Sequence, residues 1–94
     1  MRELLQKIVK ELVRYPDKAV VREIITKTTK VLEIEVDEGD RGRILGRKGE
    51  TLQSIRRIVE SIAGRKNERV LVEIVDGDRS GHRAGTDAEK ENAQ

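Results

Sequence analysis

The sequence lacks cysteine, tryptophan and phenylalanine, and its 94 residues include one proline, one tyrosine and one histidine. Without cysteine, the chain can form no disulfide and no thiolate metal site, and a single histidine comes close to excluding a catalytic triad or a histidine zinc site. Every apolar run falls short of the about 20 residues of a membrane span, and no signal-peptide pattern opens the chain. We therefore expect a cytoplasmic protein that is not an enzyme and has no cofactor, metal site, membrane partner or small-molecule substrate.

Charged residues, in contrast, make up 40% of the chain, with a net charge of +2. Their distribution is uneven, because the segment 39–69 contains nine Lys and Arg residues against four Asp and Glu residues. That segment therefore has a net charge of +5, and the remainder has −3. A local excess of cations is typical of a polyanion-binding face, although a solvated helix surface has the same pattern.

Amphipathic helices are predicted where apolar residues recur every three or four positions. Two such stripes are present: Leu4, Leu5, Ile8, Val9, Leu12 and Val13, and then Leu52, Ile55, Ile58, Val59 and Ile62. Strands are predicted where β-branched residues cluster or where apolar and charged residues alternate. In chain order, the patterns predict a helix over 2–14, a strand over 20–25, a turn at 27–30, a strand over 31–36, a short helix over 40–45, a helix over 50–63 and a strand over 69–75.

Three finer expectations depend on local features. Asp40 is expected to be the N-cap of the 40–45 helix, because a carboxylate there can accept from the first free backbone amides. Gly64 is expected to be the C-cap of the 50–63 helix. The strand over 69–75 is apolar at nearly every position, which favours a central place in the sheet.

The composition changes after residue 76, because residues 77–94 contain no Val, Leu or Ile. Such a segment cannot bury enough apolar surface to offset the entropy of ordering it. We therefore expect one folded domain over 1–76 and a disordered polar tail over 77–94.

The most informative motif is Gly46-Arg47-Lys48-Gly49, which falls between the two predicted helices 40–45 and 50–63. As an ordinary helix corner, it would need one glycine for a positive φ. As a nucleotide P-loop, it would need a Lys-Ser or Lys-Thr pair after the second glycine, where Glu50 stands. As a dinucleotide fingerprint, it has the wrong glycine spacing and no surrounding βαβ unit.

A nucleic-acid clamp explains more of the motif than these alternatives do. Glycines at both ends of the loop lack Cβ atoms, so a sugar-phosphate backbone can approach the main chain. The free amides at the start of the second helix favour phosphate, and Arg47 and Lys48 would project toward the same anion. This is the device by which the GXXG loop of a KH domain holds a nucleotide chain.

The chain resembles the bacterial single-KH proteins of the KhpA family. The resemblance covers residues 2–76, through the YPD turn and the stretches VLEIEV, ILGRKGETLQSIRRIV and RVLVEIVD. It implies an α+β, type II KH fold of order α-β-β-α-α-β, with a three-stranded sheet and three helices packed on one face. Nothing in the resemblance assigns a role to the tail.

The residues expected to bind RNA lie in and beside the loop. Arg43 and Arg56 would flank it electrostatically, with Arg56 expected to face outward more than Arg57. Arg65, Lys66 and Arg69 would either form an opposite wall or be surface charge. The full set is Gly46, Arg47, Lys48 and Gly49 in the clamp, with Arg43, Ile44, Leu45, Leu52 and Arg56 around it. Of the apolar members, which would also serve as core, Ile44 and Leu45 are expected to be partly exposed to a base.

The resemblance further implies an RNA chaperone or post-transcriptional regulator that binds single-stranded RNA. It also implies a homodimer or a complex with a KhpB (Jag)-like RNA-binding protein, and a role in cell-wall synthesis and cell shape. A different hypothesis is a protein-interaction subunit whose partner makes the main RNA contacts. The two cations in the middle of the loop favour RNA binding by the chain itself.

Overall fold

The computed structural model describes residues 1–75, so the tail predicted over 77–94 lies outside the described residues. The predicted order α-β-β-α-α-β is confirmed, with short 3-10 turns, labelled η, between the main elements. In chain order, the elements are α1 (Arg2–Leu12), η1 (Pro16–Lys18), β1 (Val20–Ile25), β2 (Lys30–Glu35), η2 (Glu38–Asp40), α2 (Arg41–Leu45), η3 (Arg47–Gly49), α3 (Glu50–Arg65) and β3 (Val70–Val75).

The three described strands form one mixed sheet of order β1-β2-β3. β1 and β2 form an antiparallel hairpin in which Val21 pairs with Ile34. β3 lies parallel to β2, with Val72 opposite Leu32. β2 is therefore central and β3 is an edge strand, so the prediction that the 69–75 strand is central is wrong. An apolar run does not distinguish the two positions here, because Leu71 lies on the uncovered face of the sheet and is 46% exposed.

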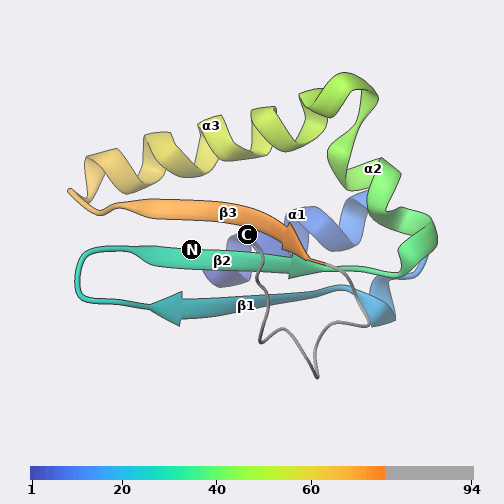
Figure 1. Ribbon diagram of the computed structural model, residues 1–94, viewed down its shortest axis with the longest axis horizontal. Helices are drawn as coiled ribbons and strands as arrows, with labels where there is room; N and C mark the ends of the chain where they lie inside the picture. Colours follow the sequence, from blue (N-terminus) through green and yellow to red (C-terminus); the bar gives the residue numbers. More distant parts are fainter. Residues whose placement is uncertain (76–94) are drawn as a thin grey trace, which may run out of the picture.

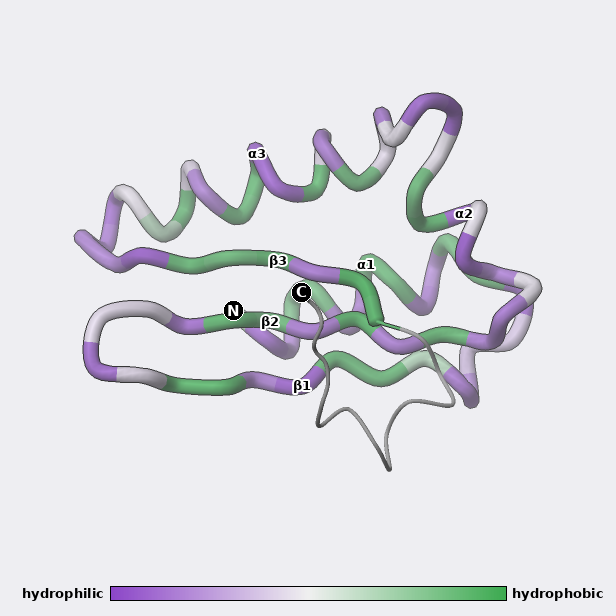
Figure 2. The backbone as a smooth tube through the Cα atoms, in the orientation of Figure 1, coloured by the Kyte–Doolittle hydropathy of each residue, from purple (hydrophilic) through white to green (hydrophobic). Residues whose placement is uncertain are grey.

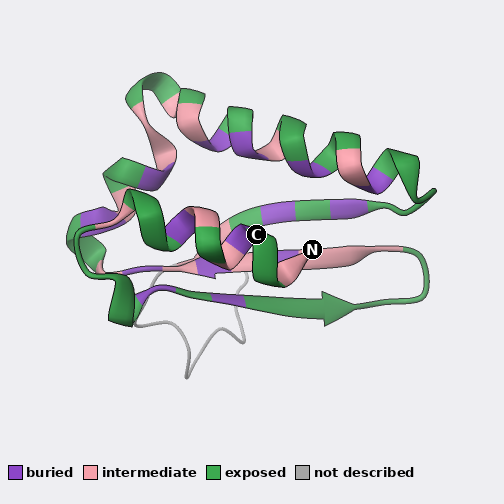
Figure 3. Cartoon of the chain, turned by 180° about the vertical axis from the view of Figure 1, so that it is seen from behind, coloured by how far each residue is buried: buried purple, intermediate pink, exposed green. Residues whose placement is uncertain are grey.

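Helices cover one face of the sheet, which confirms the predicted fold class. Seen from behind, α1 crosses that face, while α3 runs alongside β3 (Figure 1, Figure 3). The hydrophobic segments of α3 lie on its side toward β3 (Figure 2). The core comprises Leu5, Val9, Ala19, Val21, Leu32, Ile34, Val36, Ile44, Leu52, Ile55, Val59, Ala63, Val70 and Val72.

The buried stripe of each helix is narrower than its apolar pattern. α1 is buried through Leu5 and Val9 and ends at Leu12, while Leu4 is 43% exposed. On α3, Ile58 is 49% exposed. A helix packed on a flat sheet buries mainly the residues in line with the contact, so the flanks of a wide apolar stripe remain at the surface.

The C terminus of α3 is not capped by Gly64, which lies inside the helix, so that prediction is wrong. The residue with positive φ is Asn67, at 58°. The N–H of Glu68 donates to the carbonyl of Ala63, and the N–H of Asn67 donates to that of Gly64. This is a Schellman cap with asparagine in place of the usual glycine.

Candidate nucleic-acid interface

The Gly46–Gly49 loop joins α2 to α3 at one end of the molecule, beyond the ends of the strands (Figure 1). Two polar contacts fix α2, which leads into it. An Nη1–H of Arg41 donates to the carbonyl of Val75 at 2.9 Å. The Asp40 carboxylate, just before α2, accepts hydrogen bonds from the chain that leaves α1. The loop is therefore attached to both the sheet and α1.

Asp40 differs from its predicted role as a helix N-cap, because its side chain makes no cap hydrogen bond to α2. Its two carboxylate oxygens accept instead from the backbone N–H groups of Arg14 and Tyr15, each at 3.0 Å. Arg43 pairs with the same carboxylate at 3.3 Å. The sequence could not show this, because the amides that bind Asp40 lie 25 and 26 residues away.

These partners change the acidity of Asp40. Burial raises the pKa of this carboxyl, but the hydrogen bonds from Arg14 and Tyr15 and the positive charge of Arg43 outweigh burial. The net result is a pKa below the ordinary value of 3.8. Asp40 is therefore an anion at neutral pH and holds Arg43 beside the loop.

The backbone of the loop is left-handed at three of its four positions. The φ angles are 76° at Gly46, 56° at Lys48 and 77° at Gly49. Lys48 is not a glycine, so its conformation costs about 1 kcal/mol or more relative to the right-handed region. Such local strain is found mainly where the surrounding structure or a function requires the geometry.

The two glycines are required for different reasons. A Cβ on Gly46 would lie 2.2 Å from Oγ1 of Thr51 and 2.7 Å from its backbone nitrogen. A Cβ on Gly49 would meet open space. Gly46 therefore lets the loop fold against the first turn of α3, whereas Gly49 leaves an open surface at the N terminus of that helix.

Arg47 and Lys48 are both exposed at this corner. Within residues 1–75, neither side chain is engaged in an ion pair or hydrogen bond. Gly49 has no side chain to cap α3. The N–H of Glu50, the first residue of α3, donates to the carbonyl of Arg47, and the N–H groups that follow in the first turn of a helix lack intrahelical partners. Two cations and a helix N terminus thus meet at one open corner, which favours an anion.

The apolar residues around the loop are mostly core. Ile44 is completely buried, so the expectation that its side chain is partly exposed to a base is wrong. Leu45 is half-buried and packs against the core. Leu52 and Ile55 are 5% and 4% exposed, so they support the loop from beneath. Of the apolar set, the structure leaves Leu45 accessible.

The two central arginines of α3 are placed opposite to expectation. Arg57 is the exposed one, and Arg56 is half-buried. Nε–H of Arg56 donates to the backbone carbonyl of Val72 at 3.0 Å. Sequence reasoning missed this contact because helical phase gives the direction of a side chain but not the strand that lies beside it.

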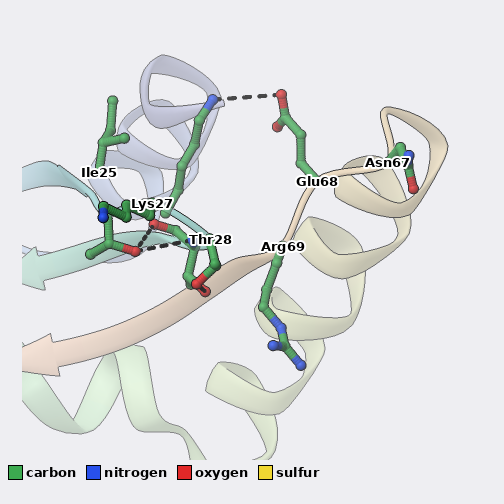
Figure 4. Close-up of a pocket in the computed structure, with 9 residues that line it drawn as sticks. Ile25, Lys27, Thr28, Asn67, Glu68 and Arg69 are labelled. Atoms are coloured by element: carbon green, nitrogen blue, oxygen red, sulfur yellow. Dashed lines mark hydrogen bonds and ion pairs between the residues drawn. The ribbon is translucent and has the colours of Figure 1, made fainter.

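Arg65, Lys66 and Arg69 lie at the other end of α3, about 24 Å along the 16-residue helix. They therefore do not form a second wall beside the loop. Arg69 lines a shallow pocket of about 240 Å³ between the β1–β2 turn and the α3–β3 connection (Figure 4). Lys30, at its rim, pairs with Glu68 at 3.6 Å. The pocket is smaller than the about 300–1,000 Å³ typical of small-molecule sites.

Residues 1–75 contain no group of three or more His, Cys, Asp or Glu side chains arranged to bind a metal ion. Their helices are also too short or too polar to span a membrane. The loop corner is thus the strongest candidate site among these residues.

The fold and the loop together define a KH domain. The family model described as "KhpA/KhpB, KH domain" matches residues 2–74, and the chain therefore belongs to this family. It is 36% identical to RNA-binding protein KhpA of Clostridium acetobutylicum, over 80% of this chain and 100% of that protein. It is 38% identical to RNA-binding protein KhpA of Chlamydia trachomatis, over 81% of this chain and 97% of that protein.

A solved structure shares the architecture. The crystal structure of Aquifex aeolicus Era aligns with a TM-score of 0.57 and 22% sequence identity, over 80% of this chain and 29% of that chain. At this identity, the likeness concerns the fold alone.

Proposed function

We propose that this chain binds single-stranded RNA at the Gly46–Gly49 loop. The observation that carries the proposal is the pair of exposed cations at the open N terminus of α3, Arg47 and Lys48, which have no ion-pair partner within residues 1–75. Membership of the KhpA/KhpB family and the names of its relatives, RNA-binding protein KhpA, support the same ligand.

The grip is on the phosphates. Open space beside Gly49 lets a nucleotide backbone approach the first turn of α3, and the side chains of Arg47 and Lys48 neutralise the adjacent phosphates. Arg43, held by Asp40, adds positive potential from α2. The one aromatic residue of the chain, Tyr15, follows α1, so base stacking on aromatic rings contributes little. We therefore expect weak binding with modest sequence preference.

The biological role that fits such an RNA grip is that of an RNA chaperone or post-transcriptional regulator in the cytoplasm. A single weak site gains useful affinity when a second site binds the same RNA. We therefore propose that the chain acts as a homodimer or with a KhpB (Jag)-like RNA-binding partner. A role in cell-wall synthesis and cell shape belongs to the same proposal.

The test is the double variant Arg47→Asp/Lys48→Asp. We expect it to keep the circular-dichroism spectrum and melting temperature of the wild type, because both side chains are exposed and neither is paired with another of the described residues. Its affinity for a fluorescein-labelled single-stranded RNA should fall by at least about tenfold in anisotropy titrations, because two cations become two anions beside phosphate.

Lys7→Asp/Lys27→Asp is the matched control, since it changes the net charge equally at exposed positions of α1 and of the β1–β2 turn. It should lose much less affinity than the loop variant. If the loop variant binds RNA as well as the wild type, or if the wild type alone binds none, the loop is not the RNA site. The protein-interaction subunit would then be the better reading.

A further inference from the structure

Arg56 connects α3 to the free edge of the sheet. Its Nε–H donates to the carbonyl of Val72 at 3.0 Å, and the side chain is half-buried between helix and strand. Arg56 is on α3, seven residues after Gly49 and therefore about 10.5 Å further along the helix axis. Seven residues are close to two full turns, so Arg56 lies on the same side of α3 as Gly49.

The carbonyl of Val72, which accepts the hydrogen bond from Arg56, points away from β2. Within residues 1–75, β3 pairs with β2 on one side only, and the N–H of Lys30 donates to the carbonyl of Arg69. Backbone groups alternate along a strand, so residue 69 and every second residue after it face β2. Val72 belongs to the other set, whose N–H and C=O groups form the outer edge.

This contact changes what the edge offers to a ligand. An edge strand presents alternating donors and acceptors, but the acceptor at Val72 is already taken by a guanidinium. That bond uses one of the five N–H donors of the Arg56 guanidinium, which has no acceptor atom. The edge beside α3 therefore presents donors at a point where the bare strand would present a carbonyl.

We propose that Arg56 selects the base next to the clamped phosphates, favouring a base edge with two adjacent acceptors. This inference rests on the proposed function, because a strand held at the loop and running along β3 passes Arg56. Val72 fixes the guanidinium through Nε, and Nη1 and Nη2 form the fork that meets the base. Two parallel N–H···acceptor bonds are the arrangement that a guanidinium forms best.

The base chemistry follows from the positions of donors and acceptors. Guanine has O6 beside N7, and cytosine has O2 beside N3. Adenine places its N6 amino donor beside both N7 and N1, and uracil places its N3–H donor between O2 and O4. The two Nη groups of Arg56 can therefore donate two hydrogen bonds to guanine or to cytosine. With adenine or uracil, one of these two groups meets a donor.

The experiment uses the full chain and fluorescein-labelled eight-nucleotide RNAs of uridine with UU, AA, GG or CC at the two central positions. Wild type should bind the GG or the CC RNA at least about fivefold more tightly than the UU and AA RNAs, the low end for one bidentate contact. Replacing guanine by 7-deazaguanine distinguishes the two sources, because it removes N7 and should abolish a preference that depends on guanine.

Three variants distinguish a base preference of Arg56 from a general electrostatic attraction to RNA. Arg56→Gln should bind all four RNAs within about twofold of one another. Arg56→Lys keeps the charge without the planar fork, and it should retain affinity for the UU RNA but lose the preference. Arg57→Gln, the matched control on the exposed side of α3, should weaken binding to all four RNAs alike and retain the preference.

Each alternative outcome is decisive. Equal binding of the four RNAs by the wild type overturns the inference and leaves the proposed function intact. A preference that survives in both Arg56→Gln and Arg56→Lys also overturns it. Failure of the wild type to bind any of these RNAs overturns both proposals.

Discussion

At the scale of single residues, the loop depends on two glycines with different tasks. Gly46 has a φ of 76° and a ψ of 174°. A Cβ atom added at this position would lie only 2.2 Å from Oγ1 of Thr51. Gly49 has a φ of 77° and open space beside it. Replacing either glycine strains the backbone, but only at Gly46 would the added methyl group also collide with α3.

We expect Gly46→Ala to lower the free energy of unfolding by at least about 2 kcal/mol, because it combines a nearly glycine-only conformation with a steric clash. Gly49→Ala should lower it by about 1 kcal/mol, the strain of one left-handed alanine. Urea denaturation of the two variants measures the difference. Equal losses would contradict the close approach between Gly46 and Thr51.

The RNA affinity of Gly49→Ala is informative in its own right. Its methyl group would occupy the open space where we place the nucleotide backbone, so binding should weaken even at temperatures where the variant is fully folded. An anisotropy titration well below the melting temperature makes this comparison. Undiminished affinity would show that the ligand does not approach the loop at this point.

At the scale of elements, Asp40 holds α2 against the chain that leaves α1. The carboxylate accepts from the amides of Arg14 and Tyr15 and pairs with Arg43. In Asp40→Asn, the amide group keeps one acceptor oxygen and loses the other, so one backbone N–H loses its partner. This variant should be less stable at pH 7, and its loop should be less firmly held.

The pH dependence of that difference has a definite sign. The folded-state pKa of Asp40 lies below its ordinary 3.8, so its contribution to stability is complete above about pH 4 and is lost as the pH falls through the folded-state pKa. The difference in unfolding free energy between wild type and Asp40→Asn should therefore be constant from pH 7 to pH 5 and shrink below 3.8. A gap of the same size at pH 7 and pH 2.5 would disprove this linkage.

Elements were largely predictable from the sequence because their signals are local. The alternation in residues 31–36, the helical stripe from Leu52 and the glycine loop each depend on neighbours within a few positions. The partners of Asp40 and Arg56 were not predictable, since they depend on which segments meet in space. The edge position of β3 was also missed, because Leu71 is apolar on a face that none of the described helices covers.

At the scale of the whole molecule, the net charge of +2 is small, and the binding charge is concentrated at the loop. With two or three phosphates neutralised, log K should fall against log salt with a slope of about −0.7 per phosphate. Between 50 and 200 mM salt, the affinity for single-stranded RNA should fall by about 7- to 18-fold. Anisotropy titrations at both salt concentrations measure this ratio, and salt-independent affinity would contradict a phosphate grip.

The attachment of α2 at both ends has a kinetic consequence. Because Asp40, Arg41 and the contact of Gly46 with Thr51 already fix the corner, an arriving nucleotide chain meets a main-chain geometry that needs no rearrangement. The entropic cost of ordering on binding is then limited to the side chains of Arg47 and Lys48 and to the RNA itself. We therefore expect RNA to associate and dissociate rapidly at this loop. A longer residence time would require additional contacts elsewhere on the RNA rather than closure of the loop around it.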